Sequence, residues 1–242
     1  MYDHYRHLYL EYLSEEVPHP NVHVQGATRP RVRKLETWKN FKSILKHGSE
    51  IDLEKAIDVS LKDGPQVWVW SDQHFGHKNI IGFSDRPYPN LELMHECMIL
   101  NHNDYVEPGD ICIWVGDVAF LNDSEANKLI RQCNGYKILI LGNHDINKGK
   151  AKKLDFDEIH LLKHVPVNYG YTKRFDFVFT HYPCRNFDDK TINIHGHEHV
   201  AFLYTNTPNH INVNCELHGF KPINISKLAE MVSKREKFKL PS

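Results

Sequence analysis

Five short polar segments of this 242-residue chain contain the residue types that bind transition-metal ions. They are Ser71-Asp72-Gln73-His74, Gly116-Asp117, Gly142-Asn143-His144-Asp145, Thr180-His181 and His195-Gly196-His197-Glu198-His199. Imidazole and carboxylate ligands suit Mn²⁺, Fe, Zn²⁺ or Ni²⁺. They do not form the cysteine cage of a structural zinc site. The segments therefore predict a metal centre with imidazole and carboxylate ligands.

The spacing within these segments favours two ions over one. In an extended segment, residues i and i+2 point to the same side. Asp72 and His74 can therefore reach one ion, and His197 and His199 can converge on the same centre. The candidate ligands are Asp72, His74, Asp117, Asn143, His181, His197 and His199. Seven ligands are too many for one open site, and a carboxylate such as Asp117 can bridge two ions. Ions about 3.5–4 Å apart are the usual machinery for in-line displacement at phosphorus.

Each polar segment directly follows an apolar run that is typical of a β-strand. The runs occupy residues 67–70, 111–115, 138–141, 175–179 and 192–194, and a sixth run follows at 211–213. Ligands of open α/β sheets bind beyond the carboxyl ends of the strands. Five strand ends that deliver Asp, His and Asn therefore predict one convergent site.

Helical patterns lie between some of these runs, so we expect α/β layers. One helix is expected over residues 91–100, with Asn90 as its cap. A second is expected over residues 126–133 and should stop before Gly135. A last helix is expected after a cap at Ser226.

The chain divides into two regions of different composition. Residues 1–65 lack long β-like runs, and we expect a helical or irregular extension there. Residues 66–242 are expected to form the metal-binding domain. Residues 28–47 hold seven lysines and arginines against one glutamate. This charge fits a solvated helix face, a surface that contacts anions or nucleic acid, or a partner surface.

Composition excludes several classes of protein. A formal charge of −1 and a pI near 7.0 exclude a globally basic nucleic-acid binder. We expect no membrane span, because no apolar stretch approaches about 18 residues. The start of the chain mixes charges and aromatic residues, unlike a signal peptide. Five cysteines without a Cys-x-x-Cys pair indicate a reducing compartment. We therefore expect a cytoplasmic protein.

The polar segments also occur in a fixed order over residues 66–225. The order is Asp72-x-His74, Gly116-Asp117, Gly142-Asn143-His144-Asp145, His181 and Gly196-His197-x-His199. This order resembles the calcineurin-like metallophosphoesterase superfamily. The segments SDQHFGHKNIIGFSDRPY and INVNCELHGFKPI are similar to its small bacterial and bacteriophage branch. A bacteriophage origin would place the protein in the host cytoplasm. The resemblance implies an α/β fold, an αββα sandwich of two mixed β-sheets flanked by helices.

The resemblance also assigns the ligands of two divalent ions. Asp72, His74 and His199 would hold the first ion, Asn143, His181 and His197 the second, and Asp117 would bridge them. We expect Mn²⁺, with Fe, Zn²⁺, Ni²⁺ and Co²⁺ as alternatives. A hydroxide held between two cations is a nucleophile at neutral pH.

Three further residues are candidates for catalysis. By the resemblance, His144 contacts the phosphate and protonates the leaving group, and Asp145 orients His144. Arg86 lies in a loop between two site-forming strands. A guanidinium matches phosphate oxygens in a bidentate way, so Arg86 is a candidate phosphate contact.

The resemblance implies a phosphoric ester hydrolase. We expect a phosphomonoesterase that acts on small nucleotide-type phosphates by attack of the bridging hydroxide. The alternative is a phosphodiesterase or nuclease acting on nucleic acid or cyclic nucleotides. The basic segment at residues 28–47 would then lie along a phosphate backbone, and binding of nucleic acid would weaken with salt.

Two other classes of protein fit less well. Protein phosphatases resemble GDxxDRG and RGNHE, where this chain has GDVAFL and LGNHD. Metal-free relatives usually lose ligands, and all seven are present here.

Overall fold

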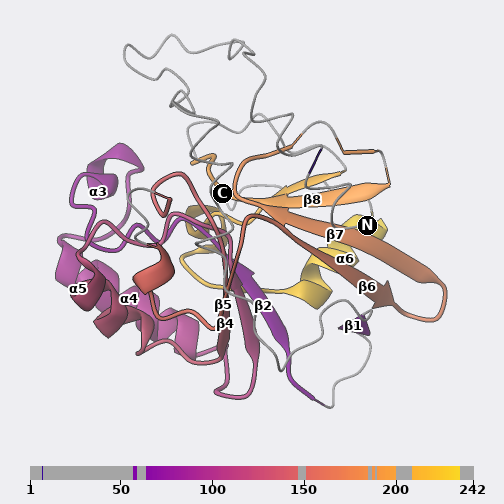
Figure 1. Ribbon diagram of the computed structural model, residues 1–242, viewed down its shortest axis with the longest axis horizontal. Coiled ribbons are helices and arrows are strands. Elements are labelled where there is room, and N and C mark those ends of the chain that lie inside the picture. Colours follow the sequence, from indigo (N-terminus) through magenta and orange to yellow (C-terminus); the bar gives the residue numbers. More distant parts are fainter. Residues whose placement is uncertain are drawn as a thin grey trace, which may run out of the picture.

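The apolar runs of the sequence form strands in two five-stranded sheets that pack face to face (Figure 1). In this computed structural model the first sheet has the order β10 (Ile223–Asn224), β2 (Val67–Trp70), β3 (Ile111–Trp114), β4 (Tyr136–Ile140) and β5 (Glu158–His160). The second has the order β1 (Ile57–Asp58), β6 (Lys163–Tyr169), β7 (Lys173–Thr180), β8 (Thr191–His195) and β9 (His210–Asn212). The structure describes residues 7, 57–58, 64–146, 151–184, 187–188, 190–199 and 209–234.

Both sheets are mixed. In the first, β2 to β5 run parallel and β10 joins β2 antiparallel. In the second, β6 and β7 are antiparallel, and the other pairs are parallel. The expected α/β sandwich of two mixed sheets is confirmed. Parallel neighbours bring several carboxyl strand ends to one edge of the sandwich, which is where the polar segments lie.

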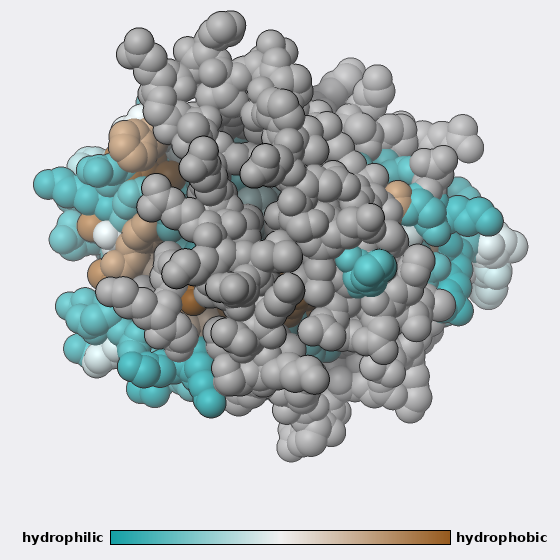
Figure 2. Space-filling model, turned by 45° about the horizontal axis from the view of Figure 1, so that its top comes forward, coloured by the Kyte–Doolittle hydropathy of each residue, from teal (hydrophilic) through white to brown (hydrophobic). Residues whose placement is uncertain are grey.

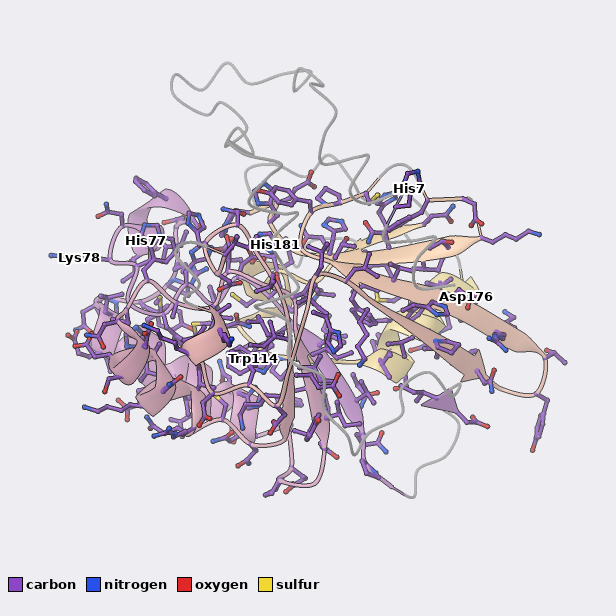
Figure 3. The ribbon with its side chains drawn as sticks, viewed as in Figure 1. His7, His77, Lys78, Trp114, Asp176 and His181 are labelled. Carbon is purple, nitrogen blue, oxygen red and sulfur yellow. The ribbon has the colours of Figure 1, made fainter. Side chains whose placement is uncertain are left out.

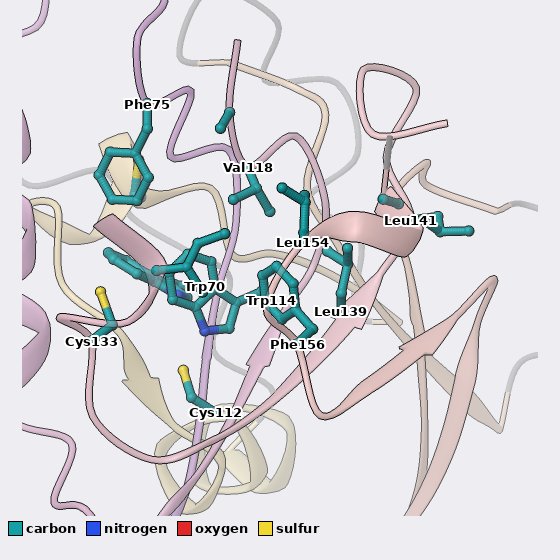
Figure 4. Close-up of a cluster of buried hydrophobic side chains, with 14 of the residues drawn as sticks. Trp70, Phe75, Cys112, Trp114, Val118, Cys133, Leu139, Leu141, Leu154 and Phe156 are labelled. Atoms are coloured by element: carbon teal, nitrogen blue, oxygen red, sulfur yellow. The ribbon is translucent and has the colours of Figure 1, made fainter. Parts of the chain in front are cut away.

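Two apolar clusters hold the layers together, and the alternation of side chains along each strand separates them. Val67 and Val69 of β2 lie in the cluster between the sheets, with Phe177 of β7. Trp70 and Trp114 point to the other face of the first sheet, where their rings pack edge to face at 4.8 Å (Figure 4).

The helices α4 (Leu91–Asn103) and α5 (Asp123–Ile130) cover that outer face. A short helix, α3 (Ile80–Phe83), precedes them. The last helix, α6 (Ile225–Lys234), packs against β2, β6 and β10 and so contacts both sheets. None of the described helices is long and apolar enough to cross a membrane.

The predicted helix ends are partly confirmed. Asn90 caps α4, because its side chain accepts a hydrogen bond from the Leu93 N–H. The second helix lies about three residues earlier than expected, because Asn122 caps α5. Ser226 does not cap α6. The Asn224 side chain accepts from the Ser226 N–H, so the cap lies two residues earlier.

The N-terminal region contributes to the second sheet. β1 belongs to the segment expected to be a helical or irregular extension, yet it pairs in parallel with β6, with Ile57 opposite Val167. The expectation is therefore wrong for residues 57–58. Two residues are too few for a strand pattern to show in the sequence. Most of the expected extension, including the basic segment at 28–47, lies outside the described residues.

Candidate metal centre

The expected ligands follow the carboxyl ends of five strands, three from the first sheet and two from the second. Asp72 and His74 follow β2, Asp117 follows β3, Asn143 follows β4, His181 follows β7, and His197 and His199 follow β8. Figure 3 shows His181 close to where strands of the two sheets meet. The centre is therefore built at the seam of the sandwich.

The ligands form two groups of three. The donor atoms of Asp72, His74 and His199 all lie within 4.8 Å of one another, and so do those of Asp117, His181 and His197. The Asp117 carboxylate lies close to imidazoles of both groups. Asp117 Oδ2 lies 3.4 Å from His181 Nε2 in its own group and 3.8 Å from His74 Nε2 in the other. This is the position that a bridging carboxylate needs.

Asn143 joins the second group. Its Oδ1 lies 3.0 Å from His181 Nε2. The other ring nitrogen of His181 is engaged on the opposite side, where Nδ1 donates to the Val115 carbonyl at 2.8 Å. A histidine whose Nδ1 donates to a carbonyl presents Nε2 as the ligand atom. The backbone of Val115, directly after β3, therefore sets the orientation of the His181 ring.

Backbone strain is concentrated at the expected ligands. The described part of the chain contains six non-glycine residues with positive φ. Four of them are expected ligands: Asp72 at 60°, His74 at 52°, Asp117 at 55° and His197 at 67°. Such conformations are uncommon outside glycine and gather at functional sites, where the surrounding structure holds them in place.

The charges of the centre are mutually dependent. Burial opposes the ionisation of Asp117, but nearby histidines, His181 first, hold its pKa well below the usual range. Burial also lowers the pKa of His181, but the Asp117 and Asp72 carboxylates outweigh it and raise that pKa to about 10. Burial, reinforced by His181, lowers the pKa of His197 to about 3. Buried carboxylates beside imidazoles are a donor set suited to divalent cations.

His74 supplies a direct test of whether the residues fit a metal. Its ring is 3% exposed, and neither ring nitrogen has a hydrogen-bond partner. Nε2 lies 3.8 Å from both Asp72 Oδ1 and Asp117 Oδ2, too far for a hydrogen bond. Buried polar atoms are normally paired. An unpaired imidazole between two carboxylates fits a cation as its missing partner.

His144 lies at the edge of this centre. Its side chain is 40% exposed, and its Nε2 lies 3.8 Å from Asp117 Oδ2. Its backbone N–H donates to Asp117 Oδ1 at 3.0 Å. Its ring packs against Phe120, with centroids 4.5 Å apart. His144 is therefore both next to the ligands and open to solvent, as a proton donor to a substrate must be.

Asp145 does not orient His144. Its two carboxylate oxygens accept hydrogen bonds from the backbone N–H groups of Asp117 at 2.7 Å, Val118 at 3.1 Å and Gly142 at 2.9 Å. Asp145 therefore ties the loop after β3 to the loop after β4. The expected role was wrong because the Asp145 carboxylate is occupied by backbone donors. Two of these donors lie more than 25 residues before Asp145 along the chain, and no sequence motif reveals such contacts.

Arg86 is not a phosphate contact in this structure. Its side chain is fully buried, and its nitrogens donate to the carbonyls of Asp72 and Gln73 and to the Glu216 carboxylate. All three guanidinium nitrogens are therefore engaged within the protein and do not bind a phosphate.

The structure adds a residue that the sequence did not reveal. Glu216 accepts from His199 Nδ1 at 2.9 Å.

The comparisons with known proteins support the fold and assign no activity. No family model matches the chain. An uncharacterized protein from Methanocaldococcus jannaschii is 29% identical over an alignment of 177 residues, which covers 70% of this chain and 92% of that protein. The crystal structure of a protein of unknown function from Aquifex aeolicus has a TM-score of 0.53 at 25% identity, covering 69% of this chain and 99% of that one. A phosphopantetheinyl hydrolase from Mycobacterium tuberculosis gives a TM-score of 0.26 at 18% identity over 50% of this chain and 44% of that one, a likeness too slight for any argument.

Metal binding is expected to stabilise the fold strongly. A ligand at about 100 times its Kd stabilises the native state by about 2.7 kcal/mol. For a chain of this size that corresponds to a rise in Tm of about 5–10 °C. Thermal unfolding of chelator-treated protein with and without Mn²⁺ measures the shift. Ca²⁺, which prefers six to eight oxygen ligands, is the matched control and should shift Tm less. An equal shift with both ions would contradict a histidine-rich site.

Proposed function

We propose that this protein is a metal-dependent phosphoesterase of the calcineurin-like type that hydrolyses small phosphomonoesters, with nucleotides as the expected substrates. One observation carries the proposal. Two three-residue ligand groups lie side by side, and Asp117 Oδ2 is within 3.8 Å of a histidine in each. Sites with two ions that share a carboxylate are typical of enzymes that displace groups at phosphorus.

Different residues of the chain would bind the cations, balance their charge and hold the ligands in place. Two divalent cations held by these groups would supply a nucleophile at neutral pH and would neutralise charge on the phosphate oxygens. Asp72 and Asp117 balance the charge of such cations. The backbone conformations of Asp72 and His74 and the hydrogen bonds of Asp145 to the loops after β3 and β4 would fix the ligands before substrate binds. Little reorganisation would then be needed during the reaction.

His144 is placed to hand a proton to the leaving group. A general acid contributes about 10²–10⁴-fold when the leaving group is a poor one. His144→Ala should therefore lower kcat on an alkyl phosphate by about 10²-fold or more, and much less on nitrophenyl phosphate, whose leaving group needs no proton. Steady-state kinetics with both substrates checks this. Equal losses on the two substrates would remove the general-acid role.

The space proposed for the leaving group is a pocket lined by residues on both sides of Ser84 along the chain. It has a volume of about 830 Å³ and lies between α3 and the start of α4, where Lys78, Ile81 and Phe83 line it among the described residues. Phe83 is 74% exposed, and Figure 2 shows apolar residues among hydrophilic ones on this side of the molecule. The next residue, Ser84, contacts a ligand histidine on the side away from the metal position, with its Oγ 3.3 Å from His199 Nδ1. A basic side chain with an exposed aromatic ring suits a nucleotide.

A pair of substrates tests the proposal. Nitrophenyl phosphate and bis-nitrophenyl phosphate differ in one ester bond, and both are assayed with Mn²⁺. The proposal predicts at least tenfold faster turnover of the monoester. Asp117→Asn purified in the same way shows whether a contaminating phosphatase is responsible. Faster turnover of the diester would favour the phosphodiesterase or nuclease alternative and would make residues 28–47 the next target. No turnover of either ester, or of a set of 5′-nucleotides, would reject the proposal.

A further inference from the structure

Glu216 is a buried carboxylate outside the predicted ligand set. It lies in the short 3₁₀ helix η4 (Cys215–His218), and the Asn214 side chain caps that helix by accepting from the Glu216 N–H. The Glu216 side chain is 2% exposed. A buried carboxylate must be paired to be tolerated. The partners of Glu216 therefore indicate what it is for.

The first partner is Arg86. Its Nε and Nη2 lie 2.9 Å and 2.8 Å from Glu216 Oε1. The same guanidinium donates to the Asp72 carbonyl at 2.7 Å and to the Gln73 carbonyl at 2.8 Å. Arg86 therefore joins Glu216 to the strained backbone of the Asp72-x-His74 segment. The rigid fork of an arginine suits this task better than the point charge of a lysine.

The second partner is His199. Its Nδ1 lies 2.9 Å from Glu216 Oε1 and 3.0 Å from Oε2. Ser84 Oγ and Asn214 Nδ2 are also near this nitrogen, each at 3.3 Å. A carboxylate only accepts, so Nδ1 carries the proton and Nε2 is left with its lone pair. Nε2 lies 3.9 Å from Asp72 Oδ1, on the side of the first ligand group.

We propose that Glu216, held in place by Arg86, is a positioning residue that fixes the ring of His199 with Nε2 toward the first metal position. The same network joins His199, which follows β8 of one sheet, to Asp72, which follows β2 of the other. Carboxylates behind metal-binding histidines orient the ring and raise its basicity. The inference rests on the proposed function only in requiring that the centre binds divalent cations.

Glu216→Gln tests the inference by metal affinity. The variant keeps the size of the side chain and removes its charge. Loss of such a partner costs about 10–100-fold in metal affinity. Calorimetric titration of the full chain with Mn²⁺ should therefore show one equivalent weakened by that factor and the other unchanged. Glu158→Gln is the matched control. Glu158 lies on the edge strand β5 and is also buried between a histidine and a cation, with His160 Nε2 at 2.5 Å and Lys163 Nζ, on β6, at 2.6 Å. This variant should bind both equivalents as the wild type does.

A double variant separates a positioning role from a general effect on folding. If Glu216 acts through His199, then Glu216→Gln should weaken Mn²⁺ no further once His199→Ala is present. Equal weakening in both backgrounds would overturn the inference, as would wild-type affinity in Glu216→Gln alone. If Glu216→Gln does not fold, Glu216→Asp takes its place, because it keeps the charge beside Arg86 but draws the carboxylate away from His199. Normal metal binding without hydrolysis of any ester would reject the proposed function and leave this inference standing.

Discussion

Asp117→Asn is expected to abolish activity while leaving the fold intact. The Asp117 carboxylate lies within 4 Å of an imidazole nitrogen in each of the two ligand groups, His74 Nε2 in one and His181 Nε2 in the other. An amide has no charge to hold two cations together. Metal stabilisation of a transition state amounts to several kcal/mol, and each 1.36 kcal/mol is tenfold in rate, so kcat should fall by at least about 10³-fold. Steady-state kinetics and the number of Mn²⁺ ions bound per chain measure the two effects.

Asp110→Asn is the matched control for this variant. Asp110 is also a buried aspartate next to β3, but it precedes the strand, whereas Asp117 follows it. Its carboxylate accepts from the Gln66 and Glu107 N–H groups and from Trp68 Nε1. Losing its charge should lower the stability and leave the Mn²⁺ stoichiometry and kcat unchanged. An Asp117→Asn chain that still binds two ions and turns over normally would show that this carboxylate does not bridge.

Gly196→Ala is expected to disrupt the centre by adding one methyl group. A Cβ at position 196 would lie within 3.0 Å of both the Ser71 hydroxyl and the Asp72 carboxylate. Both neighbours are fully buried, so neither can move aside freely. Overpacking of this kind costs about 1–3 kcal/mol of stability. The loop that carries His197 and His199 would shift, and a displacement of about 1 Å costs about 10²-fold in rate.

Thermal unfolding and kcat in Mn²⁺ measure the two consequences of Gly196→Ala. Gly109→Ala is the control, because a Cβ there meets no atom within 4 Å and the residue lies before β3, at the end opposite to Asp117. It should change neither quantity appreciably. A Gly196→Ala chain with normal Tm and normal turnover would mean that the close packing of Gly196 against Ser71 and Asp72 is not needed for the centre.

The grouping of the candidate ligands was predictable from the sequence, because parallel strands bring segments that are far apart in the chain to one edge of a sheet. Each apolar run ends in a polar segment, and parallel pairing of β2, β3 and β4 brings three of those segments together. The first group has the three residues expected for it. The second contains the expected His181 and His197 together with Asp117, and Asn143 lies beside His181. The Asn90 cap was also predictable, because helix capping depends on residues that are close in sequence.

The roles of the supporting residues were not predictable because they depend on contacts across the fold. Arg86 and Glu216 are 130 residues apart, yet they form one buried ion pair. Asp145 was expected to contact its sequence neighbour, but it binds backbone groups of the loop after β3. The strand β6 was missed because Pro166 interrupts its pattern. β1 pairs with β6 only from Val167 onward, so Pro166 has no partner on that side among the described residues.

The most direct test of the central claim is a Mn²⁺ titration of chelator-treated protein that follows bound metal and hydrolysis of nitrophenyl phosphate together. If two ligand groups that share Asp117 form one catalytic centre, turnover should be absent in chelator and should rise until two equivalents are bound. Turnover that survives complete removal of metal, or that is complete with one equivalent, would contradict a dinuclear phosphoesterase.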